Sequence, residues 1–312
     1  MKAVEARQLV KVYRSRRKST TALRGIDLDV SAGKLFSFLG RNGAGKTTFV
    51  KIASTLLMPT GGEISVLGHD VVNDPNSARK EIAVVPQGIR PYWHLTPKEH
   101  VFHYLRFRGV TREEAKSRTE WIIRDMGLEE FANTPALQLS GGLKQRTMVA
   151  MVLASTAPVL FLDEPTIGMD PMARRQVWRV IENIRSKGST IFLTTHYLDE
   201  AERLSEELAV INNGEVLYKG DVAGMKAKVG ADYRAILNRS TPHSLLEGYG
   251  KVMEDGGRLL VLSDRKGVMS LAEMASREGI EVSVGPVSLE EAFILLAGSD
   301  SRTWEEGEED GF

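Results

Sequence analysis

The chain has 312 residues, enough for one large domain or two smaller ones with a sizeable core. Its 41 Lys and Arg residues balance its 41 Asp and Glu residues, and a net charge of zero argues against a generic binder of nucleic acids or anionic membranes. There is no cysteine, which excludes disulfides and thiolate metal sites and suits a cytoplasmic protein.

Two strands are predicted near the N-terminus, over residues 3–14 and 24–30. In the second, apolar residues alternate with Asp27 and Asp29, so one face is expected to be buried and the other to face water. Tyr13 ends the first strand. Its ring is either ordinary packing, which the residues alone favour, or a flat face on which a nucleotide base stacks.

The most informative stretch reads GRNGAGKTT and satisfies the phosphate-binding pattern of Gly, four residues, Gly-Lys and then Ser or Thr. Its members are Gly40, Arg41, Asn42, Gly43, Ala44, Gly45, Lys46, Thr47 and Thr48. The apolar run 34–39 before it is typical of a buried strand, and apolar residues at helical spacing follow it over 49–57. The alternative is a chance turn, but strand, Gly-rich turn and helix are the context that the pattern needs.

The chemistry of this loop follows from its backbone and two side chains. The glycines let successive N–H groups and the helix N-terminus face one anion. Lys46 can reach the β- and γ-phosphates, the Thr47 hydroxyl can hold Mg²⁺, and Thr48 would add a hydroxyl and an N–H near the α-phosphate. We therefore expect the chain to bind a nucleoside triphosphate with Mg²⁺.

The next segments supply strands, a helical region and a connection. Residues 64–72 are predicted to form a short strand, and residues 83–85 a buried strand that leads to Gln87. A lone Gln in that place is normally an ordinary polar loop residue. Residues 96–126 show helical spacing, and residues 127–139 form a connecting segment.

Ser140, Gly141 and Gly142 are expected to begin a helix that is open to a ligand. Ser140 is a natural N-cap, and glycines in a first turn cost stability relative to Ala. Their presence indicates that an anion approaches the backbone closely.

The apolar segment 149–162 is shorter than the about 20 residues that a membrane span needs, so any link to a membrane is expected to come through a partner.

Residues 159–162 read as a second buried strand, with Asp163 and Glu164 at its carboxyl end. Ligands bind outside the carboxyl ends of strands in open parallel sheets. One acid there can hold the Mg²⁺ of the phosphate loop, and the next can orient or deprotonate a water. A third such strand, 191–194, leads to His196, which by itself is more often structural than catalytic.

Residues 221–300 are predicted to form a small α/β domain. Its strands are expected at 233–237, 258–262 and 280–284, and its helices at 243–250, 267–277 and 288–297. The last stretch, 301–312, carries a run of acidic residues and is expected to be a disordered tail.

Taken together, the motifs resemble those of the ATP-binding cassette (ABC) ATPases over about residues 3–220. The nine-residue loop is similar to Walker A, with Arg41 where Pro or another residue often stands. The other matching segments are the Q-loop at 85–87, the signature motif at 139–146, Walker B at 159–165, the D-loop at 167–170 and the switch histidine at His196. The resemblance implies an α/β P-loop NTPase domain over 1–220, with an antiparallel β subdomain and an inserted helical subdomain at about 89–150, followed by the small C-terminal α/β domain.

The resemblance also implies roles for individual residues. The catalytic residues would be Lys46, Gln87, Glu164 and His196. The Mg²⁺ ligands would be Thr47, Gln87 and Asp163. The ATP contacts would be Tyr13, the nine loop residues, Ser140, Gly141, Gly142 and Asp170. The basic segment 14–18 that follows Tyr13 is longer than the usual connection of the family, which is a departure from the pattern at the adenine site.

In such a protein two chains close head to tail on two Mg-ATP molecules. Ser140, Gly141 and Gly142 of one chain then cover the γ-phosphate held by the other. Half of each site is missing from a monomer, so hydrolysis is expected to need a second copy of the chain or a related cassette. ATP would hold the dimer shut, and hydrolysis would let it open.

Three functions compete within the family: the motor of a transporter with a separate membrane permease, a soluble ATPase of DNA repair or translation, and a non-catalytic nucleotide switch. No heptad array of the DNA-repair type is present, a single Walker A loop contrasts with the two cassettes of the translation type, and Glu164 argues against a switch. A transporter ATPase on the cytoplasmic side of the cell membrane is therefore expected, with no nucleic-acid partner.

Two segments, TTHYLDEAERL at 194–204 and SLEEAFILLAG at 288–298, resemble the daunorubicin-resistance ATPases. The resemblance implies export of a drug, lipid or similar substrate, with import as the alternative. Tyr92 and Trp93 follow the Q-loop. They are expected either to dock the permease or to pack within the helical subdomain.

Overall fold

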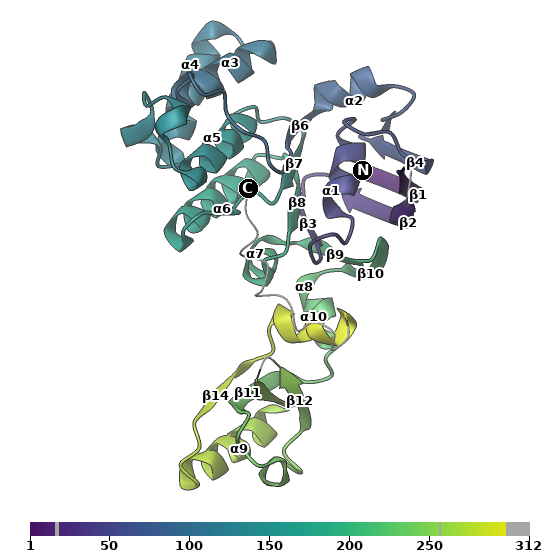
Figure 1. Ribbon diagram of the computed structural model, residues 1–312, viewed down its shortest axis with the longest axis vertical. Coiled ribbons are helices and arrows are strands. Elements are labelled where there is room, and N and C mark those ends of the chain that lie inside the picture. Colours follow the sequence, from purple (N-terminus) through teal and green to yellow (C-terminus); the bar gives the residue numbers. More distant parts are fainter. Residues whose placement is uncertain (16–18, 256, 298–312) are drawn as a thin grey trace. The chain divides into compact units, whose positions relative to one another are not determined.

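The computed structural model describes residues 1–15, 19–255 and 257–297 (Figure 1). The chain divides into two compact units, one of Met1–Lys219 and one that begins at Gly220. The acidic stretch 301–312, expected to be a disordered tail, lies outside the described residues.

An antiparallel sheet carries the N-terminal residues of the first unit. Its order is β2-β1-β4-β5, with β1 at Lys2–Arg14, β2 at Ser19–Ser31, β4 at Gly61–Val66 and β5 at His69–Asp70. The alternation predicted for the second strand is confirmed, although that strand begins at Ser19 rather than at residue 24. The single strand predicted over 64–72 is wrong, because Leu67 and Gly68 have positive φ and turn the chain into a hairpin.

A six-stranded sheet forms the centre of this unit. Its order is β10-β9-β3-β8-β7-β6, from strands at Leu35–Leu39 (β3), Ile82–Val85 (β6), Val159–Asp163 (β7), Thr190–Thr195 (β8), Glu207–Asn212 (β9) and Glu215–Gly220 (β10). The strands from β9 to β6 are parallel, so their carboxyl ends lie at one edge. Every residue of β3, β7 and β8 is buried, as the apolar runs predicted.

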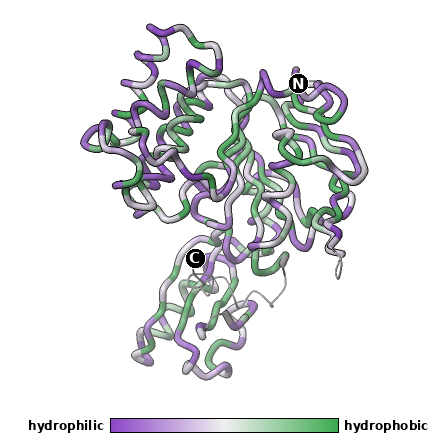
Figure 2. Tube along the Cα trace, turned by 45° about the horizontal axis from the view of Figure 1, so that its top comes forward, coloured by the Kyte–Doolittle hydropathy of each residue, from purple (hydrophilic) through white to green (hydrophobic). Residues whose placement is uncertain are grey.

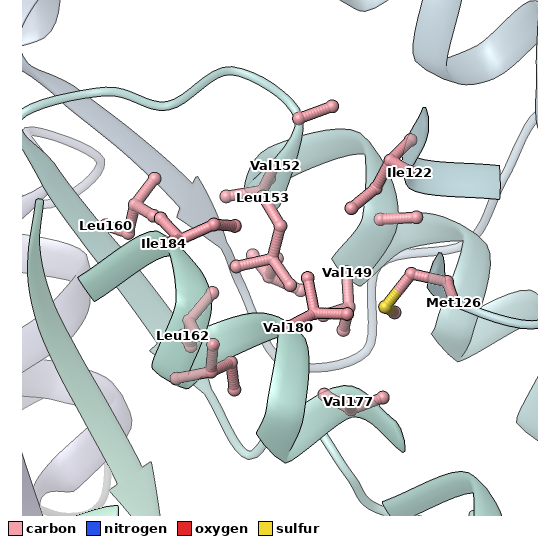
Figure 3. Packing of buried hydrophobic residues seen from close by; sticks show 14 of the residues in the cluster. Ile122, Met126, Val149, Val152, Leu153, Leu160, Leu162, Val177, Val180 and Ile184 are labelled. Atoms are coloured by element: carbon pink, nitrogen blue, oxygen red, sulfur yellow. The ribbon is translucent and has the colours of Figure 1, made fainter. Parts of the chain in front are cut away.

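Alternate residues of the central strands join two different clusters, which buries the sheet on both faces. Leu160 and Leu162 pack with α5 (Gly141–Leu153) and α6 (Pro171–Ser186) (Figure 3). Phe161 points to the opposite cluster, which contains α1 (Lys46–Ala53) and the antiparallel sheet. Figure 2 shows the resulting concentration of hydrophobic residues along the central strands.

Two helices and α5 form a helical region beside the sheet. They are α3 (Pro97–Phe107) and α4 (Arg112–Asp125), and both contact α5. The continuous pattern predicted over 96–126 is interrupted at Gly109, which has a φ of +82°. The connection 127–139 contains two 3₁₀ turns, Glu129–Phe131 and Ala136–Gln138. Across the described ranges, no helix is both long and apolar enough to cross a bilayer.

Two short helices complete the first unit. α2 (Pro75–Glu81) was not predicted, because Ala78 is its only buried residue and the segment shows no apolar period. α7 (Leu198–Leu204) follows β8 and carries Glu200, whose side chain is buried.

The second unit is a four-stranded antiparallel sheet with helices on both faces. Its order is β12-β13-β11-β14, from strands at Tyr233–Asn238 (β11), Lys251–Asp255 (β12), Arg258–Ser263 (β13) and Val282–Pro286 (β14). Leu259 and Val261 pack with α9 (Arg265–Arg277), whereas Leu260 and Leu262 belong to a cluster that includes a residue of α10 (Leu289–Ala297). A further helix, α8, spans Val222–Ala227 and contacts α10.

The helix predicted over 243–250 is wrong. The segment makes only a 3₁₀ turn, His243–Leu245, and then leads into β12, which was not predicted. Gly248 and Gly250 have φ values of +86° and +158°, which a helix does not accommodate. A Cβ on Gly250 would also lie 2.3 Å from the carbonyl oxygen of Leu262, so the glycine permits close contact with β13.

Candidate active site

The phosphate-binding pattern forms a tight loop between β3 and α1. Gly43 and Gly45 have φ values of +80° and +115°, a backbone conformation that other residues rarely adopt. A Cβ on Gly45 would lie 2.7 Å from the carbonyl oxygen of Ala22, and one on Gly40 would lie 2.4 Å from that of Ile211. Glycine is therefore required at both ends of the loop, where the backbone is pressed against neighbouring strands.

The middle of the loop acts through its backbone. Ala44 is buried, donates its N–H to the carbonyl of Arg41 at 3.1 Å and accepts the N–H of Gly214 at 2.9 Å. Asn42 and Gly43 are exposed. The loop is thus held on the β9–β10 turn while these two residues face outward.

We expect Gly45→Ala to lower the free energy of unfolding by about 1–3 kcal/mol more than Gly43→Ala. Both substitutions force Ala into a positive φ, but a Cβ on Gly43 meets nothing within 4 Å. The difference therefore isolates the clash with Ala22, and chemical denaturation of both variants measures it. Equal losses would contradict the packing described for Gly45.

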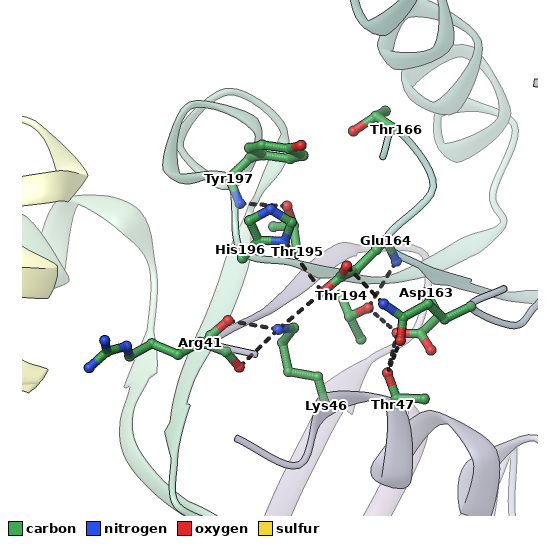
Figure 4. A network of polar contacts seen from close by, with 12 residues as sticks. Arg41, Lys46, Thr47, Asp163, Glu164, Thr166, Thr194, Thr195, His196 and Tyr197 are labelled. Carbon is green, nitrogen blue, oxygen red and sulfur yellow. Dashed lines mark hydrogen bonds and ion pairs between the residues drawn. The ribbon is translucent and has the colours of Figure 1, made fainter. Parts of the chain in front are cut away.

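Lys46 is almost fully buried at the start of α1, where its charge is shared among three oxygens. Its Nζ donates to the carbonyl oxygens of Gly40 at 2.7 Å and Arg41 at 3.2 Å, and it lies 3.2 Å from Oε1 of Glu164 (Figure 4). Burial lowers the pKa of Lys46, and the neighbouring Glu164 opposes that effect. The ammonium group is thus placed at the point where the loop backbone and the acid of β7 meet.

Three oxygen-bearing side chains converge beside the first turn of α1. The Thr47 hydroxyl donates to Oδ1 of Asp163 and lies 3.2 Å from both that atom and Oε1 of Gln87. Asp163 is fully buried, and burial raises its pKa. Its Oδ2 has no hydrogen-bond partner, so one carboxylate oxygen is left to accept a ligand. Hydroxyl, carboxylate and amide oxygens suit a hard cation such as Mg²⁺, so these residues fit that ion.

Glu164 occupies a constrained position at the end of β7. Its φ is +49°, a strained value for a non-glycine residue that costs about 1–3 kcal/mol. Its N–H lies 3.1 Å from both the carbonyl and the hydroxyl oxygen of Thr194, and Nε2 of Gln87 donates to its Oε2 at 3.2 Å. Burial alone would raise the pKa of Glu164, but His196 and Lys46 more than offset it and the pKa is lowered. The side chain is therefore a carboxylate at neutral pH, held in one orientation.

His196 follows β8 and lies beside the same acid. Its Nδ1 is 3.4 Å from Oε1 of Glu164, and that nitrogen makes no hydrogen bond. The rings of His196 and Tyr197 are 4.1 Å apart between centroids. The histidine is thus close enough to contact a group bound between Lys46 and Glu164.

Thr194 is a site residue that the sequence reasoning missed. Its hydroxyl donates to Oδ1 of Asp163, and its oxygens hold the N–H of Glu164. It lies at the carboxyl end of β8, directly opposite Asp163 in the parallel register. The rule that placed Asp163 and Glu164 at a ligand-binding edge would also have found Thr194, because the same edge contains the end of each parallel strand.

Tyr13 and Thr48 lie together on the opposite side of the loop. Their hydroxyl groups are 3.3 Å apart, and the Tyr13 side chain is exposed. Nζ of Lys11 lies 5.4 Å from the centre of the Tyr13 ring. The Tyr13 side chain is therefore partly exposed next to the phosphate loop.

The segment Ser140–Gly142 does not belong to the network of Figure 4, which is built from the loop, the Q-loop and the ends of β7 and β8. Ser140 caps α5 by accepting the N–H of Leu143 at 3.3 Å. A Cβ on Gly141 would meet nothing within 4 Å, whereas one on Gly142 would lie 2.9 Å from the carbonyl oxygen of Gly168. Gly141 therefore offers open backbone, and Gly142 is needed for packing within the chain.

Asp170 also has a local function in this chain. Its carboxylate caps α6 by accepting the N–H groups of Met172 at 3.0 Å and Ala173 at 2.9 Å. These two hydrogen bonds lower its pKa. The side chain is exposed and lies 3.9 Å from the guanidinium of Arg146.

The fold and this site define a P-loop nucleoside triphosphatase: a glycine-rich loop leads into a helix, a buried Lys begins that helix, and a pair of acids stands at the carboxyl end of the parallel strand β7. Residues 23–167 match the ABC transporter family. The chain is 36% identical to the daunorubicin/doxorubicin resistance ATP-binding protein DrrA of Streptomyces peucetius, over 99% of this chain and 97% of that protein. It is 38% identical to ATP-binding cassette sub-family A member 7 of Rattus norvegicus, over 70% of this chain and 10% of that protein.

Solved structures show the same relationship. The ATP binding subunit of an ABC transporter superposes with a TM-score of 0.66 at 28% identity, covering 73% of this chain and 93% of that one. A dimeric ATP-binding cassette in a post-hydrolysis state, bound to ADP and Pi, superposes with a TM-score of 0.65 at 28% identity, covering 70% and 98%. The chain belongs to the ABC transporter family and is an ABC-type ATPase with a nucleotide-binding site.

Proposed function

We propose that this protein is the ATP-hydrolysing motor of an exporter whose membrane permease is a separate chain. The proposal is carried by one observation: Lys46, Glu164 and His196 converge at the carboxyl edge of the central sheet, beside a phosphate loop. The similarity to DrrA over nearly the full length of both chains supports drug export, or export of a related substrate, over import.

We assign the binding of ATP and Mg²⁺ to Lys46 and to the residues around it. Gly40–Gly45 and the N-terminus of α1 cradle the phosphates, and Lys46 contacts the β- and γ-phosphates. Thr47, Gln87 and Asp163 would hold Mg²⁺, which when bound neutralises charge on the phosphates. Tyr13 offers its exposed ring to adenine.

The hydrolysis step falls to Glu164 and His196. The Glu164 carboxylate polarises the attacking water, which must reach the γ-phosphate in line with the departing oxygen. His196 contacts the γ-phosphate and stabilises the charge that develops there. Gln87 contacts both Thr47 and Glu164, so the position of its side chain would depend on both the Mg²⁺ site and the base.

A second copy of the chain would complete each site. Ser140, Gly141 and Gly142 begin α5 outside the network around Lys46, and a related cassette is dimeric. We assign Ser140, Gly141 and Gly142, with Asp170 of the D-loop, to the nucleotide bound by the partner. Hydrolysis therefore requires a head-to-tail dimer.

Mixing two inactive variants tests this arrangement. Lys46→Ala removes a phosphate contact, and Gly141→Asp places a negative charge in the open space that would face the γ-phosphate of the partner. Each variant alone is expected to hydrolyse little ATP. An equal mixture should regain about a quarter of the parent activity, because half of the dimers are mixed and each mixed dimer has one intact site. A mixture no more active than its components would contradict the head-to-tail dimer.

The permease contact is assigned to the segment after the Q-loop. Tyr92 and Trp93 have relative exposures of 78% and 66%, although one face of the Tyr92 ring stacks on His100 of α3. Exposed aromatic residues next to Gln87 suit a docking surface that communicates with the site. The protein would then lie on the cytoplasmic side of the cell membrane, bound to the permease.

Purification of the chain from detergent-solubilised membranes tests this partner. A polytopic membrane protein should co-purify, and Trp93→Glu should release it while leaving the ATPase activity of the isolated chain intact. Co-purification of ribosomes or DNA instead would support a soluble ATPase of translation or DNA repair.

A further inference from the structure

Glu200 carries a fully buried carboxyl group that is not among the residues assigned to ATP or Mg²⁺ binding or to hydrolysis. Its Oε1 accepts hydrogen bonds from the hydroxyl of Thr166 at 2.9 Å and from the indole N–H of Trp178 at 2.7 Å. Its Oε2 is buried without a hydrogen-bond partner. Burying a carboxyl group is unfavourable compared with an apolar side chain of the same size, so this group calls for a functional explanation.

The carboxyl group joins the two segments that carry the hydrolysis residues. Thr166 lies two residues after Glu164, on the segment that leaves β7. Glu200 lies four residues after His196, on the segment that leaves β8, and the two strands are parallel neighbours. The bond between Thr166 and Glu200 is therefore a buried link between the backbone of the base and the backbone of the histidine.

The base needs such a link because its own backbone is strained. A positive φ at a non-glycine residue persists only where the surrounding structure holds it. Thr194 holds the N–H side of Glu164. On the following side, the carbonyl of Thr166 accepts the N–H of Met169 at 3.2 Å, so the position of Thr166 also sets the turn that leads to Asp170.

The other end of the link is fixed as well. Trp178 belongs to α6 and holds Oε1 of Glu200 from the core side. Arg174, one turn earlier on α6, lies 4.2 Å from the centre of the Tyr197 ring and 3.0 Å from Oδ1 of Asp199. Trp178 and Arg174 thus hold α7 against α6 on its buried and on its exposed side. Glu200 also connects α7 to Thr166 through its hydrogen bond.

We propose that Glu200 is a positioning residue for ATP hydrolysis: through Thr166 and through its own helix it holds Glu164 and His196 in register. The effect rests on the ATPase function proposed above. A displacement of about 1 Å in a catalytic group can cost about 100-fold in rate, so loss of the link is expected to lower kcat without removing any group that binds the phosphates.

Three variants test the proposal. Glu200→Leu keeps the volume and removes the acceptor, and we expect its kcat for ATP to fall by about 10- to 100-fold. Thr166→Val removes one donor, and its kcat is expected to fall in the same direction. Glu200→Gln keeps an acceptor oxygen for both donors, so it should restore kcat to within about threefold of the parent. Affinity for a fluorescent ATP analogue should stay within about twofold in all three, because Gly40–Lys46 is not altered.

Thr119→Val is the matched control. Thr119 is as buried as Thr166, but its hydroxyl donates to the carbonyl of Ala115 within α4, so kcat should equal that of the parent. Thermal unfolding verifies that each variant is folded, and Thr166→Val decides the question if Glu200→Leu does not fold.

Three results would overturn the proposal. They are a folded Glu200→Leu or Thr166→Val variant with the parent kcat, a Glu200→Gln variant as slow as Glu200→Leu, and a Thr119→Val variant as slow as Thr166→Val. A parent chain without ATPase activity would instead overturn the proposed function itself, so the two failures are distinguishable.

Discussion

Glu164→Gln is expected to lower ATP turnover by about 100- to 10,000-fold while ATP binding is retained. The amide has the shape of the carboxylate and still faces Nε2 of Gln87 through one oxygen, but it cannot polarise a water as a base. Lys46 and the loop bind the phosphates directly, and the negative charge of Glu164 is not part of those contacts. Steady-state hydrolysis and equilibrium ATP binding measure the two effects separately.

The same variant should accumulate as an ATP-bound dimer, because the step that opens the dimer is blocked. Size-exclusion chromatography with ATP and Mg²⁺ would show it, and removal of ATP should return the monomer. Glu206→Gln is the matched control. Glu206 also pairs with a lysine, Lys34 at 2.8 Å, but this pair lies at the amino end of β3, which is the end away from the site. The turnover of Glu206→Gln should therefore equal that of the parent. Parent-level turnover by Glu164→Gln would remove Glu164 from the role of base.

The sequence predicted those elements whose burial pattern is local. The buried strands β3, β7 and β8 are each built on a short run of mainly apolar residues, and such runs indicate burial on both faces. The segments it misjudged depend on backbone features that composition does not reveal. Residues 64–72 turn at Leu67, a residue that normally avoids positive φ, and residues 243–250 are broken by Gly248 and Gly250.

The residues of the candidate site also differ in whether the sequence alone could predict them. Residues within one contiguous motif, such as Lys46 and Thr47, could be proposed from spacing because a loop brings sequence neighbours together. His196 needed the family resemblance, since only the pairing of β7 with β8 brings it within 3.4 Å of Glu164. Thr194 and Glu200 lie in the segment 194–204, but the family resemblance gave neither of them a role. Their hydrogen bonds across 30 and 34 positions of the chain became visible only in the folded structure.

Lys46→Ala is expected to weaken ATP binding by about 100-fold, because a hydrogen-bonded charge contact is worth about 1.5–3 kcal/mol and each 1.4 kcal/mol is tenfold in affinity. The variant also loses the contacts of Nζ with the carbonyls of Gly40 and Arg41, which hold the two sides of the loop together. It leaves Glu164 buried without its lysine, so the stability of the nucleotide-free protein should fall as well.

Lys34→Ala separates the local effect from a general loss of positive charge. Lys34 lies only one residue before β3, yet its ion pair with Glu206 is at the end of the strand away from the phosphate loop, so ATP affinity should be unchanged. Titration with a fluorescent ATP analogue compares the two variants directly. Parent affinity in Lys46→Ala would contradict the loop assignment. A weak-binding Lys46→Ala together with a tight-binding, inactive Glu164→Gln would place binding and chemistry on two side chains only 3.2 Å apart.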